Sequence, residues 1–156
     1  MANNYLQSSC TIPNLTEKEA AWLRRILEAL DEREDIDARE ERWLLKELGP
    51  EAIRHCENAG NLGFSFEPKE LWLSGEEFFN VNLAIEVMQK FLQKFRPDSW
   101  LSFTYSETCS SMRVGEFGGG GMFVTAEKVE WINASLWIRE RQKAFEVKKR
   151  TRKAKR

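Results

Sequence analysis

The chain has 156 residues, the length of one ordinary domain, and its 42% hydrophobic residues exclude a wholly disordered protein. It contains no run of about 18 apolar residues, which excludes a membrane-spanning helix, and we expect no membrane partner. The formal net charge of −1 conceals an acidic body, with 17 basic and 25 acidic residues in 1–147, and a basic tail, with seven basic and no acidic residues in 148–156.

The first third of the chain predicts one strand followed by a helix. Residues 5–12 have the length of a strand and end at a proline. Thr16 and Glu19 form a capping box, in which the two side chains satisfy free backbone amides at a helix start. Apolar residues at helical spacing then extend this helix over 17–31.

A charged segment with two shorter helices is expected next. Residues 31–42 alternate acids and arginines with almost nothing to bury, so we expect them to be solvated. Asp37 and Glu40 repeat the capping spacing ahead of a helix of about ten residues. Residues 51–59 can add a further helical turn. We therefore interpret 31–60 as a helical charged insert.

The rest of the chain alternates between strand and helix periodicity. The expected elements are a hairpin over 62–73, a helix over 81–96, strands over 99–106, 122–125 and 129–132, and a helix over 134–149. In the last helix, the apolar residues Leu136, Trp137, Ile138 and Phe145 are expected to be buried.

The order of these elements predicts the fold class. Strand, helix, strand, strand, helix, strand is the plan of a ferredoxin-like sandwich, an antiparallel sheet backed by helices. We therefore predict a single α+β domain over 1–147 that carries the acidic helical insert, an extra C-terminal hairpin and an extra C-terminal helix. Residues 148–156 are expected to form a basic flexible tail.

A glycine-rich segment over 107–121 is the most unusual stretch, and we expect it to be a loop that joins two strands. Successive glycine amides can bind an anion, and an arginine can supply charge for a phosphate or carboxylate. The candidate binding residues are Glu107, Cys109, Arg113, Glu116, Gly118, Gly119 and Gly120. The alternative is a long hairpin loop or a bulged strand edge. The glycine spacing matches neither common nucleotide-binding motif.

Cysteine and histidine usage argues against several enzyme classes. Three cysteines at wide spacing predict reduced thiols, and this usage, together with the lack of a secretory signal at the N-terminus, predicts a cytoplasmic location. The single histidine, His55, excludes metal sites that need two imidazoles, and we expect no metal and no cofactor. Cys109 with His55 as base could act as a nucleophile, but we favour a buried structural thiol for Cys109. We lean against an enzyme.

The basic tail is the clearest electrostatic signal. Its candidate nucleic-acid contacts are Lys148, Lys149, Arg150, Arg152, Lys153, Lys155 and Arg156. Such a segment can neutralise several phosphates of DNA or RNA. The alternatives are a solvated terminus or an intramolecular partner for the acidic residues in 31–57.

Aromatic residues in the predicted strands add a comparison with RNA-recognition domains. Phe64, Phe66, Phe103 and Tyr105 alternate with polar residues, as the base-stacking side chains of those domains do. The RNP1 pattern is absent from the chain, and alternating aromatic residues also form cores.

The acidic body allows a different partner. A net charge of −8 on a small domain can dock onto a basic groove of a host nucleic-acid-binding or defence protein and inhibit it. Simple solubility explains the same charge.

Three runs resemble a group of small uncharacterised proteins of bacterial plasmids and phages. They are the residues ETCS at 107–110, RVGEFGGG at 113–120 and FVT at 123–125. The similarity covers about residues 58–138 and transfers no site residue, because the group has no established activity. It implies an accessory protein of a mobile element. The leading hypothesis is a non-enzymatic binding protein of this kind whose tail contacts nucleic acid.

Overall fold

The structure is a computed structural model that describes residues 4–59, 62–111 and 116–154, with side chains described over 4–56, 62–111 and 116–147. Within these residues it forms six strands and five helices. In chain order they are β1 (Asn4–Ile12), α1 (Glu17–Asp31), α2 (Ala38–Leu48), α3 (Pro50–Ala59), β2 (Gly63–Glu67), β3 (Glu70–Gly75), α4 (Val81–Phe95), β4 (Trp100–Cys109), β5 (Gly118–Thr125), β6 (Val129–Asn133) and α5 (Ala134–Ala154).

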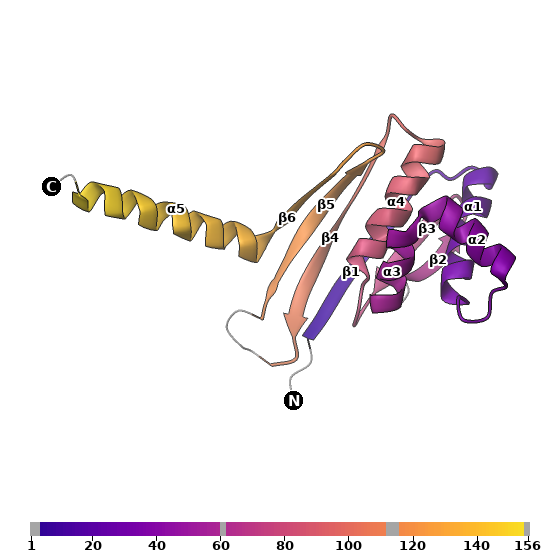
Figure 1. Cartoon of the computed structure of the whole chain (residues 1–156), viewed down its shortest axis with the longest axis horizontal. Coiled ribbons are helices and arrows are strands. Elements are labelled where there is room, and N and C mark those ends of the chain that lie inside the picture. Colours follow the sequence, from indigo (N-terminus) through magenta and orange to yellow (C-terminus); the bar gives the residue numbers. More distant parts are fainter. Residues whose placement is uncertain (1–3, 60–61, 112–115, 155–156) are drawn as a thin grey trace.

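The strands form one open antiparallel sheet in the order β2-β3-β1-β4-β5-β6. The predicted α+β class with an antiparallel sheet is confirmed. Helices α1 to α4 gather at one end of the molecule, and α5 extends from the opposite end (Figure 1). The expected helix over 17–31 and the expected hairpin are both present, and the hairpin pairs Phe66 with Leu71 across its turn.

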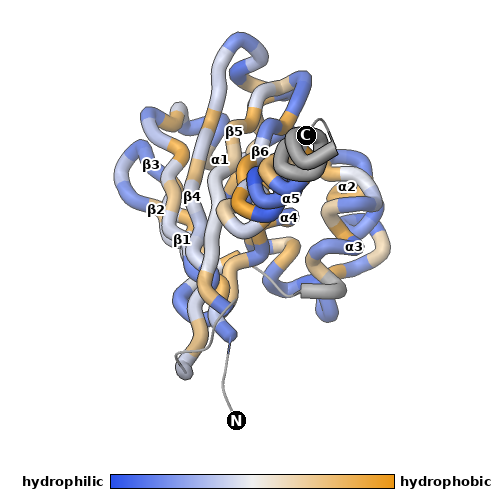
Figure 2. Tube along the Cα trace, turned by 90° about the vertical axis from the view of Figure 1, so that its left-hand side faces the viewer, coloured by the Kyte–Doolittle hydropathy of each residue, from blue (hydrophilic) through white to orange (hydrophobic). Residues whose placement is uncertain are grey.

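Burial alternates along the strands, because one face of the sheet lies under the helices. Leu71 and Leu73 are completely buried against them, whereas Trp72 between these residues is 44% exposed. Figure 2 shows the strands on the left and helices α2 and α3 on the right. We call the face under the helices the covered face. The opposite face, which carries Trp72, Trp100 and Phe123, is the open face.

Helices α2 and α3 contribute to the core, although the sequence suggested an insert that decorates it. Asp37 caps α2 by accepting hydrogen bonds from two backbone amides, and the chain then buries Leu44, Leu48 and Ala52 completely. The apolar residues of 44–56 therefore belong to the core, where α2 and α3 pack against α4.

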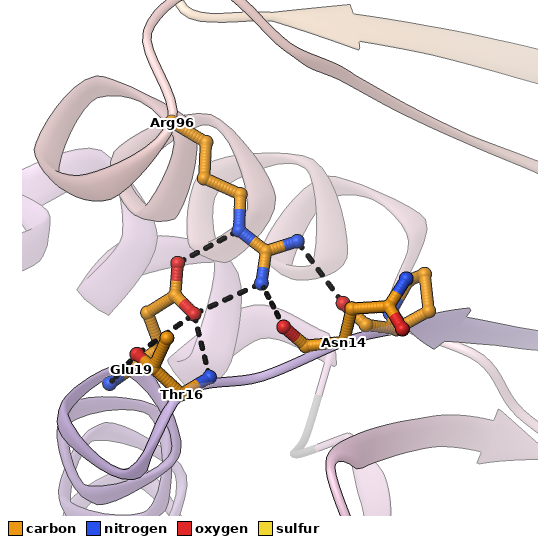
Figure 3. Close-up of polar contacts among 5 residues, drawn as sticks. Asn14, Thr16, Glu19 and Arg96 are labelled. Carbon is orange, nitrogen blue, oxygen red and sulfur yellow. Dashed lines mark hydrogen bonds and ion pairs between the residues drawn. The ribbon is translucent and has the colours of Figure 1, made fainter.

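The start of α1 is tied to the end of α4. The predicted capping box is present: the Thr16 backbone amide donates to Glu19 Oε2 at 2.8 Å, and the Glu19 amide donates to Thr16 Oγ1 at 3.3 Å. Arg96 follows α4 and donates to both carboxylate oxygens of Glu19, at 2.7 and 2.9 Å (Figure 3). It also donates to the carbonyl oxygens of Pro13 and Asn14. This network joins two segments that are distant in sequence, residues 13–19 and the end of α4.

Helix α5 differs from its prediction. The apolar residues expected to be buried are between 39% and 66% exposed, because α5 points away from the other helices (Figures 1 and 2). The helix also continues to Ala154, so the first part of the expected tail is helical. Among the described residues, no helix combines the length and the apolar character that crossing a membrane requires.

Candidate functional site

The four glycines lie in a paired strand, and the loop predicted over 107–121 is therefore shorter than expected. Strand β4 continues to Cys109, and β5 begins at Gly118. Across these strands Glu107 pairs with Gly118 and Tyr105 pairs with Gly120. The sequence missed this because glycine is rare inside strands and is typical of loops.

Large side chains of β4 explain why β5 needs glycine. A Cβ atom at Gly118 would lie 2.6 Å from Glu107 Oε2, and one at Gly120 would lie 2.7 Å from the Tyr105 hydroxyl. The Tyr105 hydroxyl accepts a hydrogen bond from Asn133 Nδ2 at 3.2 Å. Gly119 has a φ of +149°, a conformation that disfavours other residues. The glycine run thus lets β4 side chains cross β5.

The structure brings some of the predicted loop residues together. The Cys109 thiol donates to Glu116 Oε2 at 2.9 Å, so its partner is a carboxylate. Glu107 and Glu116 both line a hollow of about 410 Å³, together with Tyr5 and Phe78. Two carboxylates are unsuited to binding an anion. Arg113 lies outside the described residues, and the anion site stays a prediction.

The other two cysteines lie in the core. Burial raises the pKa of the Cys10 thiol to about 12, which keeps this group protonated at neutral pH. Cys56 is also buried, with its thiol donating to the Leu30 carbonyl oxygen at 3.9 Å. The prediction of free thiols is consistent with all three cysteines being unbridged in the structure.

The open face carries aromatic side chains other than the four that the comparison with RNA-recognition domains selected. Trp100 stacks on Phe123 with ring centroids 5.4 Å apart, and Trp72 is exposed on the same face. Trp72 and Phe123 line a broad hollow of about 740 Å³ on this face, together with hydroxyl groups, apolar groups and the Glu130 carboxylate. The hydroxyl groups come from Ser9, Thr11, Ser102 and Thr104.

The four aromatic residues selected from the sequence face the helices. Phe103 is buried and packs edge to face against Phe79. Phe64, Phe66 and Tyr105 are partly buried against the core. The core alternative is therefore correct for these residues. Strand periodicity alone gives two faces and does not say which of them the helices cover.

The basic tail extends α5. The backbone is helical over 148–154, which includes Lys148, Lys149, Arg150, Arg152 and Lys153. The side chains of these residues lie outside the description, as do Lys155 and Arg156 entirely.

The acidic surface lies at the other end of the molecule. Residues 17–59 hold 13 acidic and eight basic side chains and form α1, α2 and α3, far from α5 in Figure 1. Some of these charges form ion pairs, such as Arg25 with both carboxylate oxygens of Glu40 at 3.0 Å. The inhibitor hypothesis stays a prediction.

In the described part of the chain, no three His, Cys, Asp or Glu side chains meet in a way that could hold a metal ion. Compared with models of known protein families, with curated proteins and with solved structures, the chain has no match in any of the three.

Proposed function

We propose that this protein is a non-enzymatic accessory protein that binds nucleic acid through the basic end of α5. The observation that carries the proposal is the 21-residue helix that leaves the sheet and points away from the body (Figure 1). Residues 134–156 hold ten basic and two acidic side chains, whereas residues 1–133 hold 14 basic and 23 acidic ones. A cationic arm held away from an acidic body attracts phosphates with little competition from its own body.

The open face supports single-stranded nucleic acid as the ligand. Aromatic rings bind unpaired bases by stacking, and Trp72, Trp100 and Phe123 are exposed there. Glu130 is the one charged residue among the described residues that line the hollow. The lining of the hollow can therefore stack bases but offers no cation to phosphates, and the arm supplies that attraction.

We further propose a ferredoxin-like arrangement for the first four strands. Their order in the sheet, β2-β3-β1-β4, and the helices between β1 and β2 and between β3 and β4 support this arrangement. Strands β5 and β6 with α5 would then be the extra hairpin and helix. The resemblance to plasmid and phage proteins makes a mobile element the proposed context.

Neutralising the arm tests the nucleic-acid proposal. We expect the affinity for a fluorescent single-stranded oligonucleotide to fall at least tenfold when Lys148, Lys149, Arg150 and Arg152 are replaced by glutamine. Each phosphate contact that is lost means that fewer counterions are released from the nucleic acid on binding, which lowers the affinity. Fluorescence anisotropy at low salt measures this.

The matched control removes the same number of charges from the helical end of the molecule. Lys18, Arg39, Arg42 and Lys46 are exposed there, and their replacement by glutamine should leave the affinity unchanged or raise it slightly. Equal losses in both quadruple variants, or no binding by the wild-type chain, would contradict the proposal.

A second prediction concerns base stacking on the open face. Replacing Trp72 and Trp100 by alanine should weaken single-strand binding by about 1–3 kcal/mol for each base that loses its stacking partner. Binding of a duplex of the same length should change little, because its bases are already stacked. An equal loss for both ligands would show that the open face does not contact unpaired bases.

A further inference from the structure

The β6 strand and helix α5 form a unit whose described side chains are mostly exposed, with β5 as its neighbour in the sheet. In the described residues β6 pairs with β5 alone, so its other edge presents unpaired backbone groups. Asn133 ends β6 and Ala134 begins α5, which leaves no loop in which the chain could turn back over its own sheet. In Figure 2, α5 points toward the viewer, out of the body.

This unit exposes large apolar side chains. Trp131 is 58% exposed on β6, and Trp137, Ile138 and Phe145 are 49%, 50% and 66% exposed on α5. Ile138 and Phe145 share one side of α5, because positions seven apart are about two turns apart, and Trp137 lies about a quarter of a turn from them. A concentration of this kind on one element pair is typical of an interaction site.

A groove on the covered face lies beside the same unit. Trp131 is paired with Met122, and both residues line a hollow of about 350 Å³ next to the first turns of α4. Val81 and Ile85 of α4 form its other wall. The groove is mostly apolar and suits an apolar helix surface better than a polar ligand.

We propose that a second copy of this chain occupies this groove, in a twofold dimer in which the two β6 edges face each other and each α5 lies over the covered face of the partner. A twofold axis brings the same edge of both copies together, and the resulting assembly is closed, with two copies of the chain. Helix α5 spans about 31 Å at 1.5 Å per residue, long enough to reach across several strands of a partner.

The exposed apolar surface of β6 and α5 agrees with this occupant. A stable interface needs about 800 Å² from each partner, and aromatic side chains bury roughly 150–250 Å² each when fully covered. The exposed residues of β6 and α5 include Trp131, Ile132, Leu136, Trp137, Ile138, Phe145 and Val147.

Sedimentation of the full chain tests the proposal. We expect a species of twice 18.3 kDa at about 100 µM. Trp131→Glu and Ile138→Glu should each shift the chain to monomer, since both place a charge in the apolar interface. Leu45→Glu is the control, because Leu45 is an exposed helix residue at the other end of the molecule, on α2.

The outcomes separate the alternatives. A dimer that persists in both interface variants, a monomeric wild-type chain at this concentration, or an open-ended series of larger species would overturn the twofold arrangement. Circular dichroism reports whether each variant is folded. Ile138 lies on the projecting helix, so its variant decides the question if Trp131→Glu fails to fold. This proposal does not rest on nucleic-acid binding.

Discussion

Replacing Arg96 by alanine is expected to lower the free energy of unfolding by about 3 kcal/mol, because it leaves a buried carboxylate without its cation. Glu19 is 6% exposed, and both of its oxygens accept hydrogen bonds from the Arg96 guanidinium. The same side chain holds the carbonyl oxygens of Pro13 and Asn14 (Figure 3). Its loss therefore loosens the connection between β1, α1 and the end of α4. Chemical denaturation monitored by tryptophan fluorescence measures the change.

A second ion pair of the same geometry provides the control. Arg25 donates to both oxygens of Glu40, but its side chain is 52% exposed. Water screens such a pair, and Arg25→Ala should cost about 1 kcal/mol or less, even though its guanidinium also stacks on Trp43. Equal costs for the two variants would contradict a special role for the buried pair.

The Glu19 carboxylate also makes stability depend on pH. Hydrogen bonds from Arg96, opposed by burial and aided by Thr16, lower the pKa of Glu19 from 4.5 to about 2. Because the folded pKa lies below the unfolded value, the contribution is complete above pH 4.5 and is lost as the pH falls toward 2. It amounts to about 3 kcal/mol. We expect Glu19→Gln to remove this part of the pH dependence, so a wild-type-like acid transition in that variant would contradict the account.

Alanine at Gly119 or Gly120 is expected to lower the free energy of unfolding by about 2–3 kcal/mol, because the added Cβ meets backbone atoms that cannot move cheaply. At Gly119 it meets the Tyr105 carbonyl oxygen, and the φ of +149° adds strain. At Gly120 it meets the Ile132 carbonyl oxygen and the Tyr105 ring. Both changes push β5 away from a neighbouring strand.

The neighbouring glycine serves as the matched control. A Cβ at Gly121 has its nearest atoms at 3.7 Å, which is ordinary contact. Gly121→Ala should therefore be neutral or stabilise the fold by about 0.5 kcal/mol, because alanine loses less backbone entropy on folding. Thermal unfolding followed by circular dichroism compares the three variants. Equal effects at all three positions would mean that close packing does not explain why glycine is needed at Gly119 and Gly120.

The helices were predictable where a cap and an apolar stripe coincide. Thr16 and Glu19 defined the start of α1, and Asp37 defined the start of α2. Helix α5 was predictable as a helix, but its burial was not, since the stripe around Trp137 does not reveal whether a partner element exists within the chain. Long-range packing decides that point.

The candidate site was predictable only in part. The sequence indicated a special role for Gly118, Gly119 and Gly120 as an anion-binding loop. The structure gives a different reason for these glycines, since the side chains of Tyr105 and Glu107 cross the strand at this point. The exposed Trp72 and Trp100 were missed because both lie in strands that alternate with buried residues: Trp72 lies between two of them, and Trp100 begins β4 directly before one. The difference in charge between the body and 148–156 is visible in the sequence alone. The structure adds the direction of α5, which carries the basic segment away from the body.

The salt dependence of single-strand binding tests the central claim most directly. For the wild-type chain, the logarithm of the binding constant should fall linearly with the logarithm of the salt concentration, with a slope near −0.7 for each phosphate neutralised. The account predicts a slope corresponding to several contacts, reduced by about four contacts when Lys148, Lys149, Arg150 and Arg152 are glutamine. A slope that these four substitutions leave unchanged would contradict the assignment of nucleic-acid binding to the end of α5.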